Sequence, residues 1–212
     1  MRAEHLEILV EEPSMEAFLA AVLPRWLRSR ATFQIHVHQG KPELLRALEN
    51  RLRGYSHWLP ATWRIVVLVD RDSEDCMLLK QRMETAGEAS TLRTRSAPNQ
   101  VTWQVVNRIV IEELEAWFFG EWEAVRAAFP RVPVAIPRRA SYRNPDAIAG
   151  GTWEALERIF KRAGYFTGGL RKVEAAQAVG QYFNPMIVNS PSFTKFRDAI
   201  EEAVEDQLFV AP

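Results

Sequence analysis

The sequence predicts an α/β fold in which a mostly parallel sheet is flanked by helices, with a helical C-terminal portion. Two observations support this prediction. Strand-like and helix-like hydrophobic periods alternate up to residue 129, as expected of strands joined by crossover helices, and the pattern then becomes purely helical. We therefore divide the chain into an α/β core, residues 1–129, and a helical extension, residues 130–212, packed on that core as one compact unit.

Strands and helices alternate from the start of the chain. Residues 5–10 form an apolar strand, and Ser14 is placed to cap a helix that Pro24 bends or ends. Residues 32–38 alternate between apolar and polar side chains, which predicts a second strand. Leucines on a single helical face then predict a helix over residues 42–52. These elements form the first two strand-and-helix units.

The third and fourth units complete the core. Residues 64–70 form an unbroken β-branched run, which is typical of a strand covered on both faces. Ser73 is expected to cap the next helix. Residues 101–111 predict a fourth strand or a pair of strands, and residues 112–129 continue as a helix.

The C-terminal portion begins with an irregular connection. Four prolines fall within residues 130–146, so no regular element is expected there. Helices are predicted over residues 151–164, 169–183 and 190–204.

Composition limits the class of protein. The chain has 212 residues and a formal net charge of zero, so one buried core is expected and no global field attracts a polyanion. One cysteine, Cys76, excludes an intramolecular disulfide framework. We find neither a secretion signal nor a run of apolar residues long enough to span a membrane, so we expect a soluble cytoplasmic protein.

Carboxylates follow two of the predicted strands at the point where each ends. Glu11 ends the first strand, and Asp70 and Asp72 end the third. Ligands of open parallel sheets bind beyond the carboxyl ends of the strands, so these side chains are expected to converge. Carboxylate oxygens suit Mg²⁺ or Mn²⁺. The alternative is that Asp-x-Asp only terminates a strand and caps a helix, as aspartates commonly do.

Four motifs resemble those of a known family: "ILVEEPSMEAFL", "VLVDRDSEDCMLLKQRM", "IEELEAWFFGE" and "NSPSFTKFRDAI". A strand ending in glutamate, followed later by a strand ending in Asp-x-Asp, is similar to the Toprim pattern of topoisomerases, primases and OLD-type nucleases. Together the motifs look like those of an uncharacterised bacterial Toprim-like family, DUF4276. The resemblance implies a Toprim/Rossmann-like fold over most of the chain.

The resemblance also implies site residues and cofactors. Glu11 matches the glutamate with a general acid or base role, and Asp70 and Asp72 match the pair that binds one or two Mg²⁺ or Mn²⁺ ions. Glu12 stands where the family pattern has glycine. A glutamate adds bulk and negative charge at a turn where glycine lets a phosphate approach the backbone closely.

The third motif offers further carboxylates. Glu112, Glu113 and Glu115 lie in the expected first turn of a helix, where acidic residues favour the positive end of the macrodipole. In a second interpretation, Glu113 or Glu115 supplies ligands for a second cation. Asp75 is interpreted as a first-turn residue of its helix.

Basic residues are grouped in segments without acidic residues. Such connections beside a metal site would bind a phosphate backbone, although solvated loops are the alternative interpretation. Lys172 matches a lysine of the narrower family. The candidate nucleic-acid contacts are Arg71, Arg93, Arg95, Arg138, Arg139, Arg143 and Lys172.

The leading hypothesis is a Mg²⁺- or Mn²⁺-dependent Toprim nuclease that acts on DNA or RNA. The resemblance implies an ABC- or AAA-type ATPase partner encoded nearby and a role in bacterial anti-phage defence. The alternative hypothesis is a weakly active or inactive Toprim-like subunit that docks on, or senses for, that ATPase. A homo-oligomer is compatible with either hypothesis.

Overall fold

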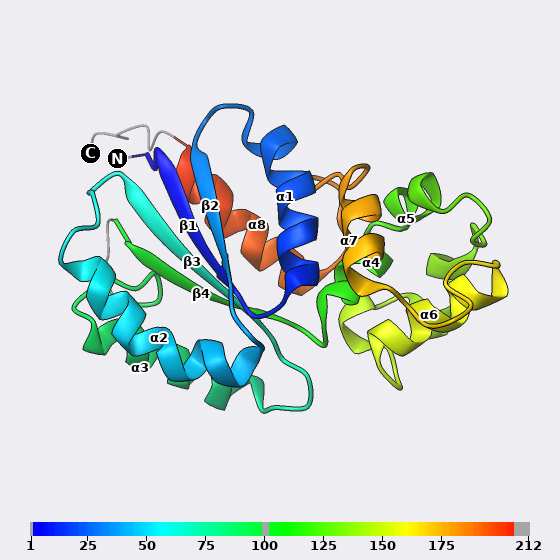
Figure 1. Ribbon diagram of the computed structural model, residues 1–212, viewed down its shortest axis with the longest axis horizontal. Coiled ribbons are helices and arrows are strands. Elements are labelled where there is room, and N and C mark those ends of the chain that lie inside the picture. Colours follow the sequence, from blue (N-terminus) through cyan, green and yellow to red (C-terminus); the bar gives the residue numbers. More distant parts are fainter. Residues whose placement is uncertain (1, 99–101, 206–212) are drawn as a thin grey trace.

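The computed structural model describes residues 2–98 and 102–205. Within these residues, a four-stranded parallel sheet has the order β2-β1-β3-β4 (Figure 1). The strands are β1 (His5–Val10), β2 (Thr32–Val37), β3 (Trp63–Asp70) and β4 (Val105–Val110). The predicted α/β fold with a parallel sheet is therefore confirmed. Of the predicted fourth strand, residue 101 lies outside the described residues.

Helices cover both faces of the sheet (Figure 1). Leucines of α2 (Lys41–Ser56) and Leu79 and Met83 of α3 (Cys76–Ala89) pack against Leu9 and Val67. The opposite face, which includes Ile8 and Val66, packs against α1 (Pro13–Leu27) and α8 (Pro191–Val204). Side chains of adjacent strand residues point to opposite faces, so the central strands are buried on both sides.

Helix α1 does not end at Pro24, and the cap residue predicted for α3 was wrong. Helix α1 continues through Pro24 to Leu27, and the backbone N–H of Arg28 donates to the Pro24 carbonyl oxygen. Proline removes one hydrogen bond, and the buried Trp26 and Leu27 hold the last turn against the core. Asp75 rather than Ser73 caps α3, because its side chain accepts hydrogen bonds from the N–H groups of Met77 and Leu78.

The predicted helix over residues 112–129 is two helices, α4 (Leu114–Gly120) and α5 (Trp122–Ala128). Glu121 separates them with φ −131° and ψ 70°, and its side chain caps α5 by accepting from the Ala124 N–H. The apolar pattern runs through this break because both helices bury their side chains in the same core. Periodicity alone therefore missed the interruption.

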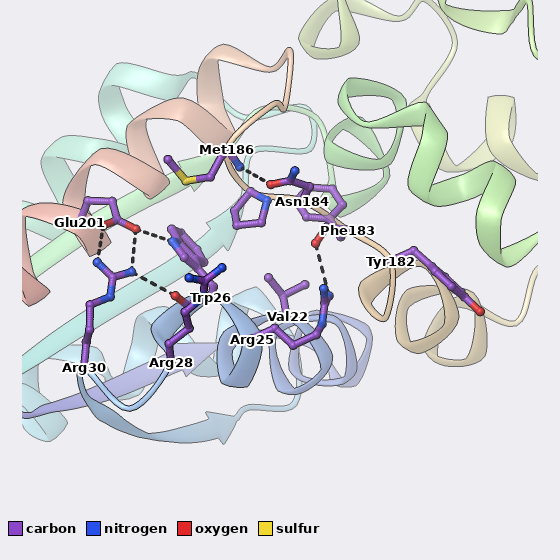
Figure 2. Close-up of a pocket in the computed structure, with 11 residues that line it drawn as sticks. Val22, Arg25, Trp26, Arg28, Arg30, Tyr182, Phe183, Asn184, Met186 and Glu201 are labelled. Carbon is purple, nitrogen blue, oxygen red and sulfur yellow. Dashed lines mark hydrogen bonds and ion pairs between the residues drawn. The ribbon is translucent and has the colours of Figure 1, made fainter.

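The C-terminal part joins the same hydrophobic core as the sheet. After three 3-10 turns, η1 (Ile136–Arg138), η2 (Ala140–Tyr142) and η3 (Pro145–Ala147), it contains α6 (Thr152–Arg162), α7 (Lys172–Gly180) and α8. Helix α7 packs on α1, where a Cβ at Gly180 would lie 3.0 Å from the Phe18 carbonyl oxygen. Glu201 of α8 accepts hydrogen bonds from Trp26 and Arg30 and fastens α8 to the end of α1 (Figure 2).

Helices α4, α5 and α6 lie beyond the carboxyl ends of the strands (Figure 1). The carboxyl edge of the sheet thus faces protein on several sides and buries polar groups there. No helix among the described residues is long and apolar enough to span a membrane.

Candidate functional site

The ends of neighbouring strands are tied together at the carboxyl edge of the sheet. The Asp70 N–H donates to Glu11 Oε1 over 2.5 Å, which joins the end of β3 to the end of β1. The Gly40 N–H donates to the Glu11 carbonyl oxygen over 2.9 Å. The Asp72 N–H donates to the Glu112 carbonyl oxygen over 3.1 Å, joining the segments after β3 and β4. The structure thus brings Glu11 beside Asp70 although 59 residues separate them in sequence.

Two of these junctions adopt an uncommon backbone conformation. Asp72 has φ 50° and Glu112 has φ 60°, which is the left-handed region. Non-glycine residues seldom adopt this conformation, and when they do the surrounding structure must hold them there. Here the hydrogen bond between the two residues holds both junctions. The strain is located at the carboxyl edge, beside the acidic residues.

Three carboxylates are buried at this edge, and two of them have an unsatisfied oxygen. Exposed fractions are 8% for Glu11, 6% for Asp70 and 1% for Glu115. Asp70 Oδ1 and Glu115 Oε2 are buried without a hydrogen-bond partner among the described residues. An unpaired buried carboxylate is costly, because nothing replaces the water that solvated it.

Burial and mutual repulsion alter the ionisation of these groups. Burial raises the pKa of Glu11 to about 7, and repulsion from Asp72 and Glu12 contributes to this rise. The hydrogen bond from the Asp70 N–H and the charge of Lys41 act in the opposite direction and lower it. Burial, followed by repulsion from Glu11 and Glu12, raises the pKa of Asp70 well above its usual value. Burial also raises the pKa of Glu115 to about 7. A bound cation would relieve this repulsion.

Lys172, a predicted nucleic-acid contact, faces these carboxylates. Burial opposes its charge, but attraction to Glu115, Glu12 and Glu113 outweighs burial and raises its pKa. The ammonium group lies 5.6 Å from the ring centroid of Trp153. Lys172 is the first residue of α7, so the packing of α7 on α1 brings this cation to the acidic site.

Lys41 is a member of the site that the sequence analysis missed. Its ammonium group lies 2.6 Å from Asp72 Oδ2 and 3.0 Å from Glu74 Oε1, and it donates to the Arg71 carbonyl oxygen. Burial opposes the charge, but the hydrogen bonds to Asp72 and Glu74 outweigh it and raise the pKa of Lys41. A lysine at the positive end of a helix, directly after a strand and Gly40, was the signal available in the sequence.

Glu12 also belongs to the acidic site. It precedes the first residue of α1 without capping that helix through its side chain, and it accepts a hydrogen bond from the Ser14 hydroxyl. Its charge raises the pKa of Glu11, Asp70 and Glu115. Glu12 therefore adds negative charge to the site.

The other glutamates of the third motif make structural contacts. Glu113 Oε2 accepts from the Trp153 N–H over 3.3 Å, which ties α4 to the start of α6. Glu112 forms an ion pair with Arg71. Arg71 is therefore close to the site, but its guanidinium is already engaged by a carboxylate.

Two of the predicted arginines lie away from the acidic site, and their role as nucleic-acid contacts stays a prediction. Thr94 pairs with Val105, the first residue of β4, so Arg93 and Arg95 lie at the amino end of that strand. The carboxylates lie at the other end, roughly 17 Å away along the strand. Arg95 also forms an ion pair with Glu202 over 2.6 Å. The prediction relied on a loop that contains arginines and no acidic residues, and this composition does not indicate which edge of the sheet the loop reaches.

The remaining predicted arginines lie in or directly after the 3-10 turns η1 and η2, which precede α6. Their side chains are exposed, and η3, which follows them, packs against α4. They are Arg138, Arg139 and Arg143. Their role as nucleic-acid contacts stays a prediction.

The described residues contain no group of three or more histidine, cysteine, aspartate or glutamate side chains already arranged to hold a metal ion. Asp72 Oδ2 is engaged in an ion pair with Lys41. The donor chemistry nevertheless fits a hard cation. Asp70 and Glu115 each present a buried carboxylate oxygen that lacks a partner.

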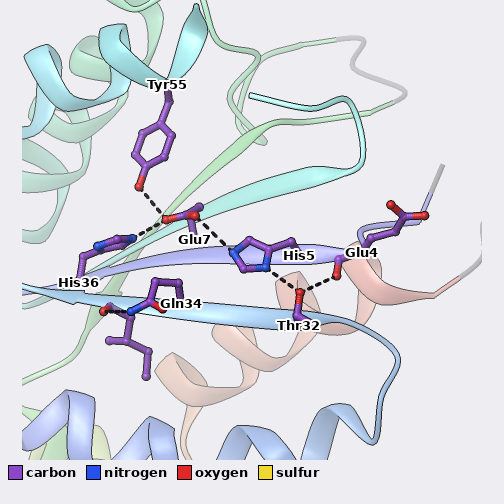
Figure 3. Close-up of polar contacts among 8 residues, drawn as sticks. Glu4, His5, Glu7, Thr32, Gln34, His36 and Tyr55 are labelled. Atoms are coloured by element: carbon purple, nitrogen blue, oxygen red, sulfur yellow. Dashed lines mark hydrogen bonds and ion pairs between the residues drawn. The ribbon is translucent and has the colours of Figure 1, made fainter. Parts of the chain in front are cut away.

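A second buried acidic group, within β1, has the opposite properties (Figure 3). Glu7 accepts hydrogen bonds from the Tyr55 hydroxyl over 2.7 Å and from His36, and His5 Nε2 lies 3.2 Å from its carboxylate. Burial opposes ionisation, but the hydrogen bonds from Tyr55 and His36 outweigh it, so the pKa of Glu7 is lowered. This carboxylate is fully paired within the fold.

The fold and the site together define an α/β protein with an acidic site at the carboxyl edge of a parallel sheet. The chain belongs to the DUF4276 family, described as a domain of unknown function, whose model matches residues 10–201. The predicted family is thereby confirmed.

One solved structure similar to the chain is the C-terminal region of the Burkholderia pseudomallei OLD protein, with 17% sequence identity and a TM-score of 0.49. The alignment covers 97% of this chain and 100% of that one. None of the curated proteins matches the chain.

Proposed function

We propose that the protein is a divalent-metal-dependent phosphodiesterase, a Toprim-type nuclease that hydrolyses DNA or RNA. The observation that carries this proposal is the convergence of buried, mutually repelling carboxylates at the carboxyl edge of the sheet, two of them with an unpaired oxygen. A fold gains nothing in stability from such an arrangement, so a function that needs a cation is its best explanation.

Asp70 and Glu115 would hold Mg²⁺ or Mn²⁺, with Asp72 joining them once it releases Lys41. The ion, when bound, would neutralise charge on a phosphodiester and activate water for hydrolysis. Glu113 is a weaker candidate ligand, because its side chain already accepts from the start of α6.

The side chains of this chain would supply proton transfer and phosphate binding. A carboxyl with a pKa of about 7 exchanges protons at neutral pH, which suits Glu11 as a general acid or base. Lys172 and Lys41 carry positive charge at the acidic edge and would position a phosphate there. Arg138, Arg139 and Arg143 would extend this contact along the backbone of a longer nucleic acid.

The family resemblance supports two further parts of the proposal. The protein would act with an ABC- or AAA-type ATPase, and the pair would serve in bacterial anti-phage defence. The ATPase would control when the nuclease acts, since the zero net charge gives the chain no general affinity for nucleic acid.

Cleavage assays would test the proposal. Purified protein should nick plasmid, single-stranded DNA or structured RNA with Mn²⁺ or Mg²⁺ and should be inactive with EDTA. Asp70→Asn, purified in the same way, should lose this activity and would expose a contaminating nuclease if cleavage persisted. Asp198→Asn, an exposed carboxylate on α8, is the matched control that should retain activity.

Two observations favour the second candidate function, an inactive subunit that docks on an ATPase. Lys41 forms an ion pair with Asp72, a proposed metal ligand. Glu12 adds a negative charge where a phosphate would approach. Absence of cleavage with and without the ATPase, together with unchanged stability in Mg²⁺, would favour this candidate. Glu12→Gly separates the two hypotheses further, since it should increase cleavage by a nuclease and leave an inactive subunit inactive.

A further inference from the structure

A groove of about 810 Å³ lies at the end of α1, between the segment 182–186 and α8 (Figure 2). Helix α1 begins beside the acidic site, so the groove residues from Val22 to Arg28 lie about 15 to 24 Å from Glu12 along the helix. Its residues take no part in the proposed nuclease site. The groove therefore needs a separate explanation.

The groove is positively charged. Arg25, Arg28 and Arg30 line it, and Glu201 is the one acidic lining residue among those the structure describes. Glu201 is already engaged, because Arg30 Nη1 lies 2.6 Å from its carboxylate and Trp26 donates to it. Among the residues that the structure describes, no carboxylate forms an ion pair with Arg25 or Arg28.

The three arginines differ in how they are held. Arg25 donates to the carbonyl oxygens of Gly180 and Phe183, and Arg30 is held by Glu201. Arg28 is exposed, and no side-chain partner is found for it among the described residues. Figure 2 shows its side chain extending toward Trp26. Arg28 has φ 48° and Ser29 has φ 64°, so consecutive left-handed residues present this free guanidinium.

One side of the groove is apolar and exposed. Tyr182, Met186 and Ile187 have exposed fractions of 53%, 59% and 62%. Tyr182 and Met186 line the groove, and Ile187 follows Met186 in the chain. Large apolar side chains grouped beside charged residues are typical of protein interaction sites.

The combination favours a protein partner over a nucleic acid or a small anion. A nucleic acid needs a track of free cations and flat rings for base stacking. Here two of three guanidiniums are engaged within the fold, and two of three exposed apolar side chains are aliphatic. An acidic side chain of a partner would pair with Arg28, and its apolar neighbours would cover Met186 and Ile187.

We propose that this groove docks a segment of another protein in which acidic side chains alternate with apolar ones. The proposal does not depend on the nuclease activity, since no residue of the groove belongs to the acidic site. It assigns the end of α1 and the segment 182–187 as an interaction surface.

Fluorescence anisotropy with labelled peptides tests the proposal. The probe is a short peptide of alternating glutamate and leucine, compared with versions in which glutamine or lysine replaces glutamate. The glutamate peptide should bind most tightly. Arg28→Asp should weaken its binding by about tenfold or more, and should bind the lysine peptide more tightly than the unaltered protein does. Aspartate tolerates the left-handed conformation, so this substitution preserves the backbone.

Two further variants complete the design. The double variant Met186→Ser, Ile187→Ser should weaken the binding of the glutamate peptide and of the glutamine peptide to the same extent, because it removes apolar contacts that both peptides make. Arg162→Asp, which reverses an exposed arginine on α6, is the charge-matched control and should leave binding unchanged.

Four outcomes would overturn the proposal. One is equal binding of the glutamate and glutamine peptides, and another is equal binding by the unaltered protein and Arg28→Asp. The third is a dimer in light scattering that Arg28→Asp dissociates, which would assign the groove to a second copy of the chain. Binding of single-stranded DNA in the same assay, if Arg28→Asp abolishes it, would likewise contradict a protein partner.

Discussion

Two buried glutamates four residues apart, Glu7 within β1 and Glu11 directly after it, have opposite pKa shifts in the folded protein. Glu7 is 6% exposed and has a lowered pKa, while Glu11 is 8% exposed and has a pKa raised to about 7. Burial opposes the ionisation of both, and the hydrogen bonds that Glu7 accepts from Tyr55 and His36 outweigh it. Tyr55, His36 and His5 surround Glu7, whereas Glu11 lies among other carboxylates. The comparison distinguishes a carboxylate whose charge is favoured by hydrogen-bond donors from one whose charge is opposed by burial and by neighbouring carboxylates.

Substitutions at the acidic site and at Glu7 should differ most in their effect on cleavage activity. Asp70→Asn should reduce Mn²⁺-dependent cleavage by about 100-fold or more, because removing a metal ligand removes the cation's contribution. Glu7→Gln should retain cleavage within a few-fold. Initial rates of plasmid nicking under identical conditions measure both variants. Equal losses in the two variants would mean that the sites are not functionally distinct.

The same pair of sites should show the reverse order in stability. Glu7→Ala should lower the free energy of unfolding by about 1–3 kcal/mol, because the Tyr55 hydroxyl and His36 lose their buried partner. Glu115→Gln should leave the free energy of unfolding unchanged or raise it in EDTA, since it removes a charge from a repelling group. Urea unfolding followed by circular dichroism gives both values. A destabilised Glu115→Gln would show that this carboxylate is paired after all.

A smaller difference between variants of the two sites is expected in how much a metal ion raises the free energy of unfolding. At ten times its dissociation constant, a cation that binds only the folded protein adds about 1.4 kcal/mol to the free energy of unfolding. Mg²⁺ or Mn²⁺ should therefore stabilise the unaltered protein and Glu7→Gln, but not Asp70→Asn. Urea unfolding with and without the ion measures the effect. A stabilisation that persists in Asp70→Asn would place the metal elsewhere.

The smallest expected effect is the dependence of stability on pH through Glu7. Its pKa is lower in the folded state than the usual value of 4.5, so its ionised form is favoured by folding. This contribution is fully present above about pH 4.5 and is lost as the pH falls through the folded-state pKa. The difference in stability between the unaltered protein and Glu7→Gln should therefore shrink between pH 5 and pH 3. A constant difference over this range would refute the assignment.

Much of the fold could be predicted because its cause is local. The unbroken β-branched run of β3 and the alternating pattern of β2 placed those strands to within one residue. Helix limits were less predictable, since Pro24 lies within α1 and Glu121 interrupts a continuous apolar pattern. In both cases packing against the core, which periodicity does not encode, decided where the helix ends.

The candidate site divides in the same way. The convergence of Glu11 with Asp70 followed from a general rule, because parallel strands end at one edge of a sheet. Lys41 escaped notice because its partners, Asp72 and Glu74, are some thirty residues away in sequence. The location of Arg93 and Arg95 depended on the pairing of Thr94 with the first residue of β4, which their loop composition does not reveal.

The sequence by itself determined a parallel α/β sheet, its family and the strand ends that carry carboxylates, because periodicity and chain order suffice for these features. Only the tertiary structure decided which carboxylates are paired and which are not. Pairing is a contact through space: Glu7 meets Tyr55, Lys41 meets Asp72, and Asp70 and Glu115 keep unpaired oxygens. Such contacts depend on the packing of segments that are distant in sequence, so the pKa shifts that they cause follow from the tertiary structure and not from the sequence pattern.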